Sequence, residues 1–264
     1  MPNDEGRVRT GVLLTLAYDG RDFHGFAPQP GVRTIAGTLL QAVRSIDPLV
    51  DQIRGASRTD AGVHAQGQLV AFDTDKTIPP KGWALGINQA LPHDVAVQSA
   101  SRVAAGFNPR FSNVRKTYAY TLHLNAVRDP LKHRRAWWVQ PPLDLALLKI
   151  ESSALIGTHD FAAFRSAADE REHTIRTIES VVIEVTLPRV VIRVTGSGFM
   201  HNMVRIVVGT LVDVARKRLS AGAVGRALLD GDRRSCGITA PPDGLLLETI
   251  ECDRSVTLDA TWPS

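Results

Sequence analysis

The sequence contains only two cysteines, Cys236 and Cys252, and neither belongs to a C-x-x-C or H-x-E pattern. We therefore expect neither a disulfide framework nor a zinc deaminase site. No uncharged apolar run reaches the length of a membrane-spanning helix, and Met1 to Thr10 is polar without an apolar stretch. These absences predict a protein that is neither exported nor membrane-spanning, and the scarcity of cysteine suits a reducing cytoplasm.

The chain has 264 residues, of which 44% are hydrophobic, and this suffices for one large domain or two ordinary ones with a sizeable core. Its 31 Lys and Arg exceed its 27 Asp and Glu, so the net charge is +4. This modest excess permits a polyanionic partner. Basic residues gather in three stretches, which form either one basic surface or scattered solvated charge: 110–116, 128–135 and 165–176.

Hydrophobic periodicity predicts the same order of elements, β-α-β-β-α-β, in each half of the chain. This order is typical of the ferredoxin-like arrangement, an antiparallel sheet with helices on one face. We therefore expect an α+β fold of two ferredoxin-like halves, residues 11–108 and 109–264, with antiparallel sheets joined around a central cleft. The expected strands are 12–18, 52–56, 67–73, 95–101, 116–124, 175–187, 190–196 and 245–251, and the expected helices are 35–46, 82–90, 143–156, 201–216 and 220–229.

Three connections between these elements are informative. Pro188 and Arg189 interrupt an alternating apolar pattern, which predicts a hairpin. Residues 166–171 are charged and lack apolar periodicity, so we expect a mobile loop there. Residues 57–66 form an extended connection between two strands of the first half.

The run from Arg58 to Ala65 lies in that extended connection and places a single carboxylate, Asp60, with no metal-ligand spacing around it. An Asp two residues before a Gly is ordinarily a turn residue. An ionised carboxylate can also act as a nucleophile. The residue types alone leave both interpretations open.

An arginine lies in the middle of the most apolar predicted helix. The stretch 199–211 is apolar almost all round, which marks it as buried, yet Arg205 interrupts it. Because an unpaired buried guanidinium costs several kcal/mol, Arg205 needs a carboxylate or a phosphate as partner. Asp213, two turns along, is one candidate. At helical spacing His201 and Gly209 share the face of Arg205, and Gly209 would let a backbone or ligand approach closely.

A third feature is the string from Arg115 to Tyr120, in which a basic pair leads into a predicted strand. Tyr118 and Tyr120 alternate onto one face of that strand. By position alone, both tyrosines are interpreted as core or edge residues.

These three strings together resemble the signatures of tRNA pseudouridine synthases of the TruA type. The resemblance spans roughly residues 11–252. Other phrases resemble the framework of that family: Tyr18-Asp19-Gly20, Gly157-Thr158-His159-Asp160-Phe161 and Ala240 to Leu245. Positions that depart from the usual family pattern do not coincide with Asp60, Tyr118 or Arg205; they are Phe26, Ser57, Asn108, Pro109 and Ile206.

The resemblance implies an isomerase that converts uridine to pseudouridine at tRNA positions thirty-eight, thirty-nine and forty, in the anticodon stem-loop. Asp60 would be the nucleophile and Arg205 its charge partner. Tyr118 would be the ring that stacks on the target base and a candidate catalytic group for proton transfer. Arg58 would fill the space that the flipped base leaves. The resemblance also implies a homodimer and neither metal nor cofactor. Further substrate contacts are expected at Phe161, Leu245 and Arg110.

Two other functions stay open at this stage. A non-catalytic RNA-binding protein could use the same scaffold, although Asp60, Tyr118 and Arg205 are all present. A carboxylate-dependent glycosidase or nucleosidase generally needs a second carboxylic acid as proton donor. Only folding could bring such an acid, Asp19 or Asp160, near the first.

Overall fold

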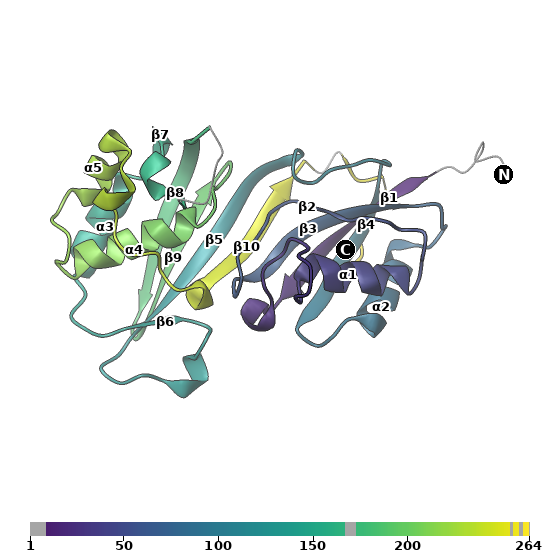
Figure 1. The fold of residues 1–264 in the computed structure, drawn as a ribbon, viewed down its shortest axis with the longest axis horizontal. Helices are drawn as coiled ribbons and strands as arrows, with labels where there is room; N and C mark the ends of the chain where they lie inside the picture. The colour runs from purple at the N-terminus through teal and green to yellow at the C-terminus, as the bar shows by residue number, and fades with distance from the viewer. Residues whose placement is uncertain (1–8, 167–172, 254–255, 259–260, 264) are drawn as a thin grey trace. The chain divides into compact units, whose positions relative to one another are not determined.

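The computed structural model describes residues 9–166, 173–253, 256–258 and 261–263. The chain divides into two compact units, and the colours of Figure 1 allow each to be followed along the chain. The first unit comprises Met1–Val114 and Thr249–Ser264, and the second comprises Arg115–Glu248. Both are mixed α and β structures whose strands pair mostly antiparallel.

The first unit is built on three antiparallel strands in the order β4-β1-β3, with the short strand β2 paired to β3. Leu14 in the middle strand lies opposite Val70 on one side and Ala100 on the other, and all three are buried. Two helices pack against each other and cover this core. The elements are β1 (Thr10–Tyr18), α1 (Ile35–Arg44), β2 (Arg54–Gly55), β3 (His64–Thr74), α2 (Pro80–Ala90) and β4 (Val95–Val103).

Local chemistry explains where the two helices begin. The Thr34 side chain accepts a hydrogen bond from the Gly37 N–H and so caps α1. Helix α2 begins at Pro80, whose missing N–H costs nothing in the first turn. The Trp83 ring meets Phe72 of β3 edge-on, with ring centroids 5.1 Å apart, which fastens α2 to the sheet.

The second unit has four antiparallel strands in the order β5-β9-β8-β7, and β6 pairs with β5 in parallel. Helices α3 and α4 pack together, and α5 contacts both. The elements are β5 (Asn113–Leu124), β6 (Trp137–Val139), α3 (Leu145–Ser153), β7 (Gly157–Asp160), β8 (Ile175–Thr186), β9 (Arg189–Gly196), α4 (Met203–Ala215), α5 (Ala223–Asp230) and β10 (Leu245–Cys252), which contains the second point of division.

The hairpin predicted at Pro188 is confirmed, because Val185 of β8 lies opposite Val190 of β9 across a tight connection. The sequence pattern did not reveal β6 and β7, which span only three and four residues and are too short to show a period. The mobile loop expected at 166–171 falls, apart from its first residue, outside the described residues. Within the described parts of the chain, no helix has the length and apolar character needed to cross a membrane.

The division of the chain differs from the one expected between residues 108 and 109. The structure divides it after Val114 and groups the C-terminal residues with the first unit. Backbone pairing explains this grouping, because Trp262 bridges Ala100 and Thr257 bridges Val103, both on the β4 strand. Such pairing between distant segments leaves no local signal in the sequence.

Candidate active site

Asp60 lies in a tight turn between β2 and β3, as its spacing from glycine predicts. Its carbonyl accepts a hydrogen bond from the Val63 N–H at 3.2 Å, and Gly62 has a φ of 79° that suits glycine. The Asp60 side chain is half-buried, whereas Arg58 before it is exposed. Strand β3 begins at His64, so the whole turn lies before this strand.

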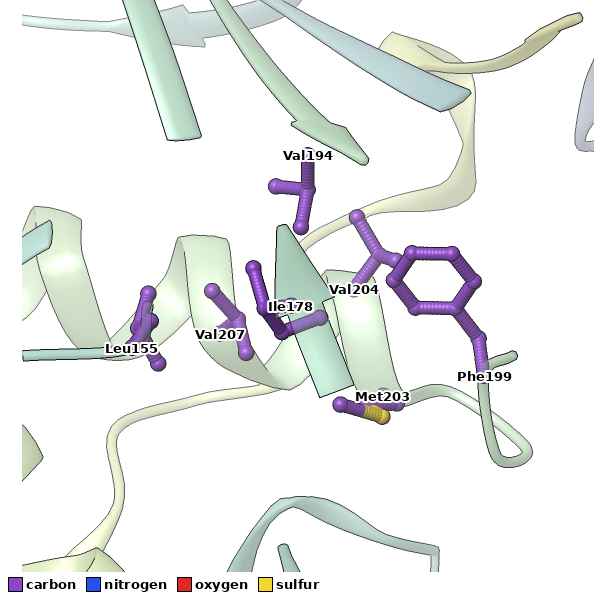
Figure 2. Close-up of a pocket in the computed structure, with 7 residues that line it drawn as sticks. All are labelled: Leu155, Ile178, Val194, Phe199, Met203, Val204 and Val207. Carbon is purple, nitrogen blue, oxygen red and sulfur yellow. The ribbon is translucent and has the colours of Figure 1, made fainter. Parts of the chain in front are cut away.

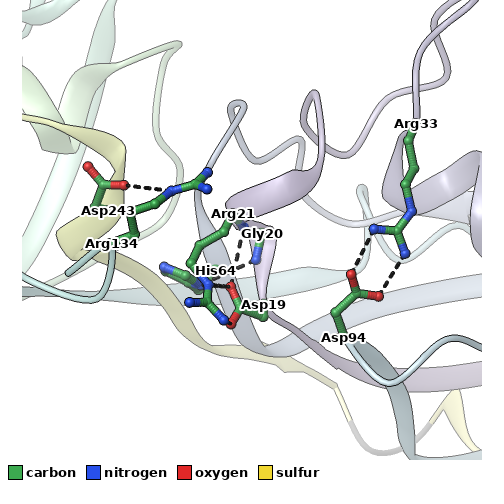
Figure 3. A network of polar contacts seen from close by, with 8 residues as sticks. All are labelled: Asp19, Gly20, Arg21, Arg33, His64, Asp94, Arg134 and Asp243. Atoms are coloured by element: carbon green, nitrogen blue, oxygen red, sulfur yellow. Dashed lines mark hydrogen bonds and ion pairs between the residues drawn. The ribbon is translucent and has the colours of Figure 1, made fainter. Parts of the chain in front are cut away.

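An ionic cluster anchors the start of β3, as Figure 3 shows. The His64 Nδ1 atom lies 3.2 Å from Asp19 Oδ1 and 3.2 Å from the Gly20 N–H nitrogen, while Arg21 binds Asp19 at 2.6 Å. Burial alone would raise the pKa of Asp19, but hydrogen bonds from Arg21 and the electrostatic interactions with His64 and Arg21 outweigh it and hold that pKa below its usual value. Because Asp19 thus stays ionised, it is a poor candidate for the proton donor that a glycosidase needs.

Two glycines, Gly20 and Gly25, let the segment 19–26 pack directly on the backbone of residues 59–63, the turn that contains Asp60. A Cβ atom at Gly20 would lie 2.0 Å from the Val63 carbonyl oxygen, and one at Gly25 would lie 2.9 Å from the Thr59 oxygen. Gly25 also has a φ of 92°, which other residues rarely adopt. The Phe26 N–H then donates to the Thr59 carbonyl at 3.0 Å. The turn around Asp60 is therefore supported by backbone contacts along one side.

Tyr118 and Tyr120 differ in their surroundings within the second unit. Tyr120 is fully buried and donates its hydroxyl to the Pro241 carbonyl at 2.7 Å. Burial raises the pKa of Tyr120 well above its ordinary value, even though the charge of Arg205 acts to lower it. Tyr118 is 6% exposed, and its ring meets Phe199 edge-on at a centroid distance of 5.1 Å. Tyr120 is a core residue, as its position predicts.

Phe199 connects Tyr118 to the apolar interior of the same unit. Figure 2 shows the Phe199 ring beside Val204 at one end of a small apolar pocket. The pocket has no polar side chain in its lining, so it is a feature of the core. Its other lining residues are Leu155, Ile178, Val194, Met203 and Val207.

Arg205 is held by two hydrogen bonds within the second unit. Its Nε atom donates to the Ala240 carbonyl at 2.8 Å, and its Nη1 atom donates to Asn202 Oδ1 at 2.7 Å. Asn202 has a φ of 60° and directly precedes α4. The predicted start of this helix at His201 was wrong, because the left-handed Asn202 interrupts the helical backbone and leaves His201 exposed outside it.

The close approach predicted at Gly209 is confirmed, and what approaches is backbone. A Cβ atom there would lie 1.8 Å from the Ile238 carbonyl oxygen. Asp213, considered above as the partner of Arg205, pairs instead with Arg218 at 3.2 Å and accepts the Ile238 N–H at 3.1 Å. Helix α4 and the segment 237–240 therefore form one packed support for Arg205.

The remaining predicted substrate contacts fall into two groups. Arg58 and Arg110 are exposed in the first unit. Phe161 is fully buried and packs edge-on against Phe164 at 5.8 Å, and Leu245 is 5% exposed. Of the three principal residues, the structure places Tyr118 and Arg205 in the second unit and Asp60 in the first.

Some of the clustered arginines make ion pairs within their own unit. Arg115 pairs with Glu179 at 3.2 Å, and Arg134 lies 3.7 Å from Asp243, a contact that Figure 3 also shows. Both arginines remain partly exposed, so these pairs contribute little to stability. The basic stretches are therefore partly neutralised at these two positions.

Comparison with known proteins identifies the family to which the chain belongs. The family model described as tRNA pseudouridine synthase matches residues 15–112 and 152–253. The match defines an isomerase, and the chain belongs to the tRNA pseudouridine synthase family. This membership agrees with the resemblance of the signature strings and leaves the glycosidase alternative without support.

The relatives cover nearly the full length of both chains and carry the name tRNA pseudouridine synthase A. The one from Geobacter sulfurreducens is 40% identical over 90% of this chain and 98% of its own. The relative from Halalkalibacterium halodurans is 38% identical over 89% of this chain and 90% of its own, and that from Myxococcus xanthus is 38% identical over 90% and 91%. A chain of the crystal structure of a Cbf5-Nop10-Gar1 complex aligns at a TM-score of 0.35 and 12% identity, over 93% of this chain and 50% of that one, which is too distant to inform the fold.

Proposed function

We propose that the protein converts uridine to pseudouridine in the anticodon stem-loop of tRNA, at positions thirty-eight, thirty-nine and forty, with Asp60 as the nucleophile. The observation that carries this proposal is the placement of Asp60 in a firmly supported turn, within a signature string of a chain that belongs to the tRNA pseudouridine synthase family. A half-buried carboxylate held in a supported turn suits nucleophilic chemistry.

The reaction detaches uracil from its ribose, turns the base and rejoins it through carbon five. The bond between the sugar and the ring nitrogen breaks, a bond from the same sugar carbon to carbon five forms, and the proton on carbon five is replaced by one on the nitrogen. No atoms are gained or lost. In this proposal Asp60 attacks either the sugar carbon or the uracil ring, or abstracts a sugar proton.

Three further residues have proposed roles in that reaction. Arg205 is the charge partner that keeps the nucleophile ionised, and its two hydrogen bonds to Asn202 and Ala240 support this role by holding its guanidinium in one orientation. Tyr118 stacks on the extruded base, a contact worth about 1 to 3 kcal/mol. Arg58, which is exposed beside Asp60, fills the gap that the extruded base leaves.

We further propose the finer features of fold and assembly that the sequence suggested. The order β-α-β-β-α-β of the first unit supports a ferredoxin-like half, and the second unit supports another with β6, β7 and α5 added. Phe161, Leu245 and Arg110 are proposed substrate-binding residues. Arg110 is exposed and would touch the RNA, whereas Phe161 and Leu245 are buried and would act by shaping the wall of the site. A homodimer and a cytoplasmic location complete the proposal.

The decisive experiment compares Asp60→Asn with the unchanged protein on unmodified tRNA transcripts. Mapping pseudouridine along each transcript should locate it in the anticodon stem-loop for the unchanged protein and nowhere for the variant. The variant should still bind tRNA, because only a carboxylate oxygen has been replaced. Full conversion by the variant would refute the role of Asp60, and tRNA binding without conversion by the unchanged protein would favour the non-catalytic RNA-binding alternative.

A further inference from the structure

Three buried polar side chains support the turn that carries Asp60, one from within the turn and two from the neighbouring strands β1 and β3. Tyr18, Thr59 and Gln68 are 5%, 6% and 0% exposed. Tyr18 ends β1, Gln68 lies within β3, and Thr59 precedes Asp60 in the turn. A buried polar group is costly unless it is hydrogen-bonded, so the contacts of these side chains constrain their neighbours strongly.

These contacts hold the turn at both residues that flank Arg58. The Tyr18 hydroxyl lies 2.8 Å from Thr59 Oγ1. The Gln68 side chain binds the Ser57 backbone twice, since its Nε2 atom donates to the Ser57 carbonyl at 2.7 Å and its Oε1 atom accepts the Ser57 N–H at 3.1 Å. The same Nε2 atom lies 3.4 Å from the Tyr18 hydroxyl, which links the two anchors.

The anchors themselves belong to a rigid part of the first unit. In the ladder between β1 and β3, Leu16 lies opposite Gln68 and Tyr18 lies opposite Ala65, with a shift of register between these pairs. Such irregularities reorient side chains at the end of a ladder. The sheet therefore fixes the backbone of Tyr18 and of Gln68, and their side chains connect that part of the sheet to the turn.

We propose that Tyr18, Thr59 and Gln68 are positioning residues, which fix the backbone from Ser57 to Asp60 so that the Asp60 carboxylate meets the target nucleotide in the productive geometry. This inference rests on the proposed role of Asp60 as nucleophile. None of the three residues needs to touch the substrate. Their effect acts through the turn, where a displacement of about 1 Å can cost on the order of a hundredfold in rate.

The test is Thr59→Val, which keeps the shape of the side chain and removes the hydroxyl that meets Tyr18. We expect kcat on tRNA transcripts to fall about 10- to 100-fold, with KM and the tRNA dissociation constant within about twofold, because the loss concerns orientation at the reacting atoms. Thr59→Ser retains the hydroxyl and should restore most of kcat. Tyr18→Phe removes the other partner of the same contact and should lower kcat in the same way.

Thr15→Val provides a matched control. Thr15 lies on the same strand as Tyr18, and its Oγ1 atom accepts a hydrogen bond from the Ser99 hydroxyl at 2.8 Å, away from the Asp60 turn. The control loses a comparable hydroxyl contact and should keep the kcat of the unchanged protein. A general loss of sheet stability would instead lower activity equally in Thr15→Val and Thr59→Val.

The possible results separate this inference from the proposed function. If Asp60→Asn is inactive while Thr59→Val and Tyr18→Phe keep full kcat, the positioning role is overturned and the nucleophile remains. If Asp60→Asn is fully active, the proposed function fails first. A Thr59→Val variant whose lost kcat is not restored in Thr59→Ser, or is matched by the control, also overturns the positioning role.

Discussion

Replacing Gly209 by alanine should disturb Arg205 without touching it. A Cβ atom at Gly209 would lie 1.8 Å from the Ile238 carbonyl oxygen and 3.2 Å from the Ala240 nitrogen, so the backbone of this segment must move by more than an ångström. The Ala240 carbonyl, which accepts the Nε–H of Arg205 at 2.8 Å, belongs to the same segment and would move with it. The substitution should therefore change the orientation of the Arg205 guanidinium by disturbing the packing of α4 against the segment 237–240.

The magnitude follows from two effects. Overpacking a close backbone contact costs about 1 to 3 kcal/mol of stability. Weakening the hydrogen bond between Arg205 and Ala240 adds about 1.5 to 3 kcal/mol, because its donor is charged. We expect a loss of about 2.5 to 6 kcal/mol in the free energy of unfolding, and a fall in kcat of about 100-fold at temperatures where the variant is still folded.

Urea unfolding measures the change in the free energy of unfolding, and steady-state kinetics on tRNA measures the change in kcat. Gly225→Ala is the matched control, since Gly225 also lies in a helix of the second unit but a Cβ atom there meets nothing within 4 Å. Alanine is the better helix former, so this control should gain about 0.5 to 1 kcal/mol and keep full activity. Equal stability and equal kcat in Gly209→Ala and the unchanged protein would refute the reasoning.

Three further predictions concern buried or paired groups. Glu151→Gln should lower stability by about 1 to 2 kcal/mol in urea unfolding, because the buried carboxylate accepts the Val224 N–H and so caps the positive end of α5. The lowered pKa of Asp19 means that its stabilising contribution is complete above about pH 4 and is lost as the pH falls through its folded-state pKa. Asp19→Asn should therefore flatten the acid limb of stability against pH, and an unchanged limb would contradict this. Burial raises the pKa of the Cys236 thiol to about 11, so iodoacetamide at pH 8 should modify Cys252 first, with mass spectrometry as the readout; equal rates would contradict the burial of Cys236.

Much of the fold could be predicted from local pattern. The apolar run around Leu14, the apolar residues around Val190 and the capping side chain of Thr34 are all properties of neighbouring residues, so the strands β1 and β9 and the start of α1 follow from them. The start of α4 could not be predicted, because Asn202 adopts a left-handed backbone conformation and its side chain binds Arg205. Such a contact becomes visible only when the turn has formed.

In the candidate site too, some residues could be identified from the sequence and others only from tertiary contacts. The string around Asp60 was found by its residue types and spacing, and Gly209 was identified as a point of close approach because glycine alone lacks a side chain there. Neither Thr59 nor Gln68 gave any signal, since buried Thr and Gln resemble surface residues in a sequence. Their importance lies in hydrogen bonds to Tyr18 and to the backbone of Ser57.

The sequence by itself determined the family of this protein, the order of its longer strands and helices, and which residues are candidates for the chemistry, because each of these depends on residue type and local spacing. Only the tertiary structure decided what holds those residues in place. Tyr18 and Gln68 bind Thr59 and Ser57 in the turn that carries Asp60, and Arg205 is held by Asn202 and a carbonyl of a distant loop. These supports join residues far apart in the chain, so they exist only after the backbone has folded.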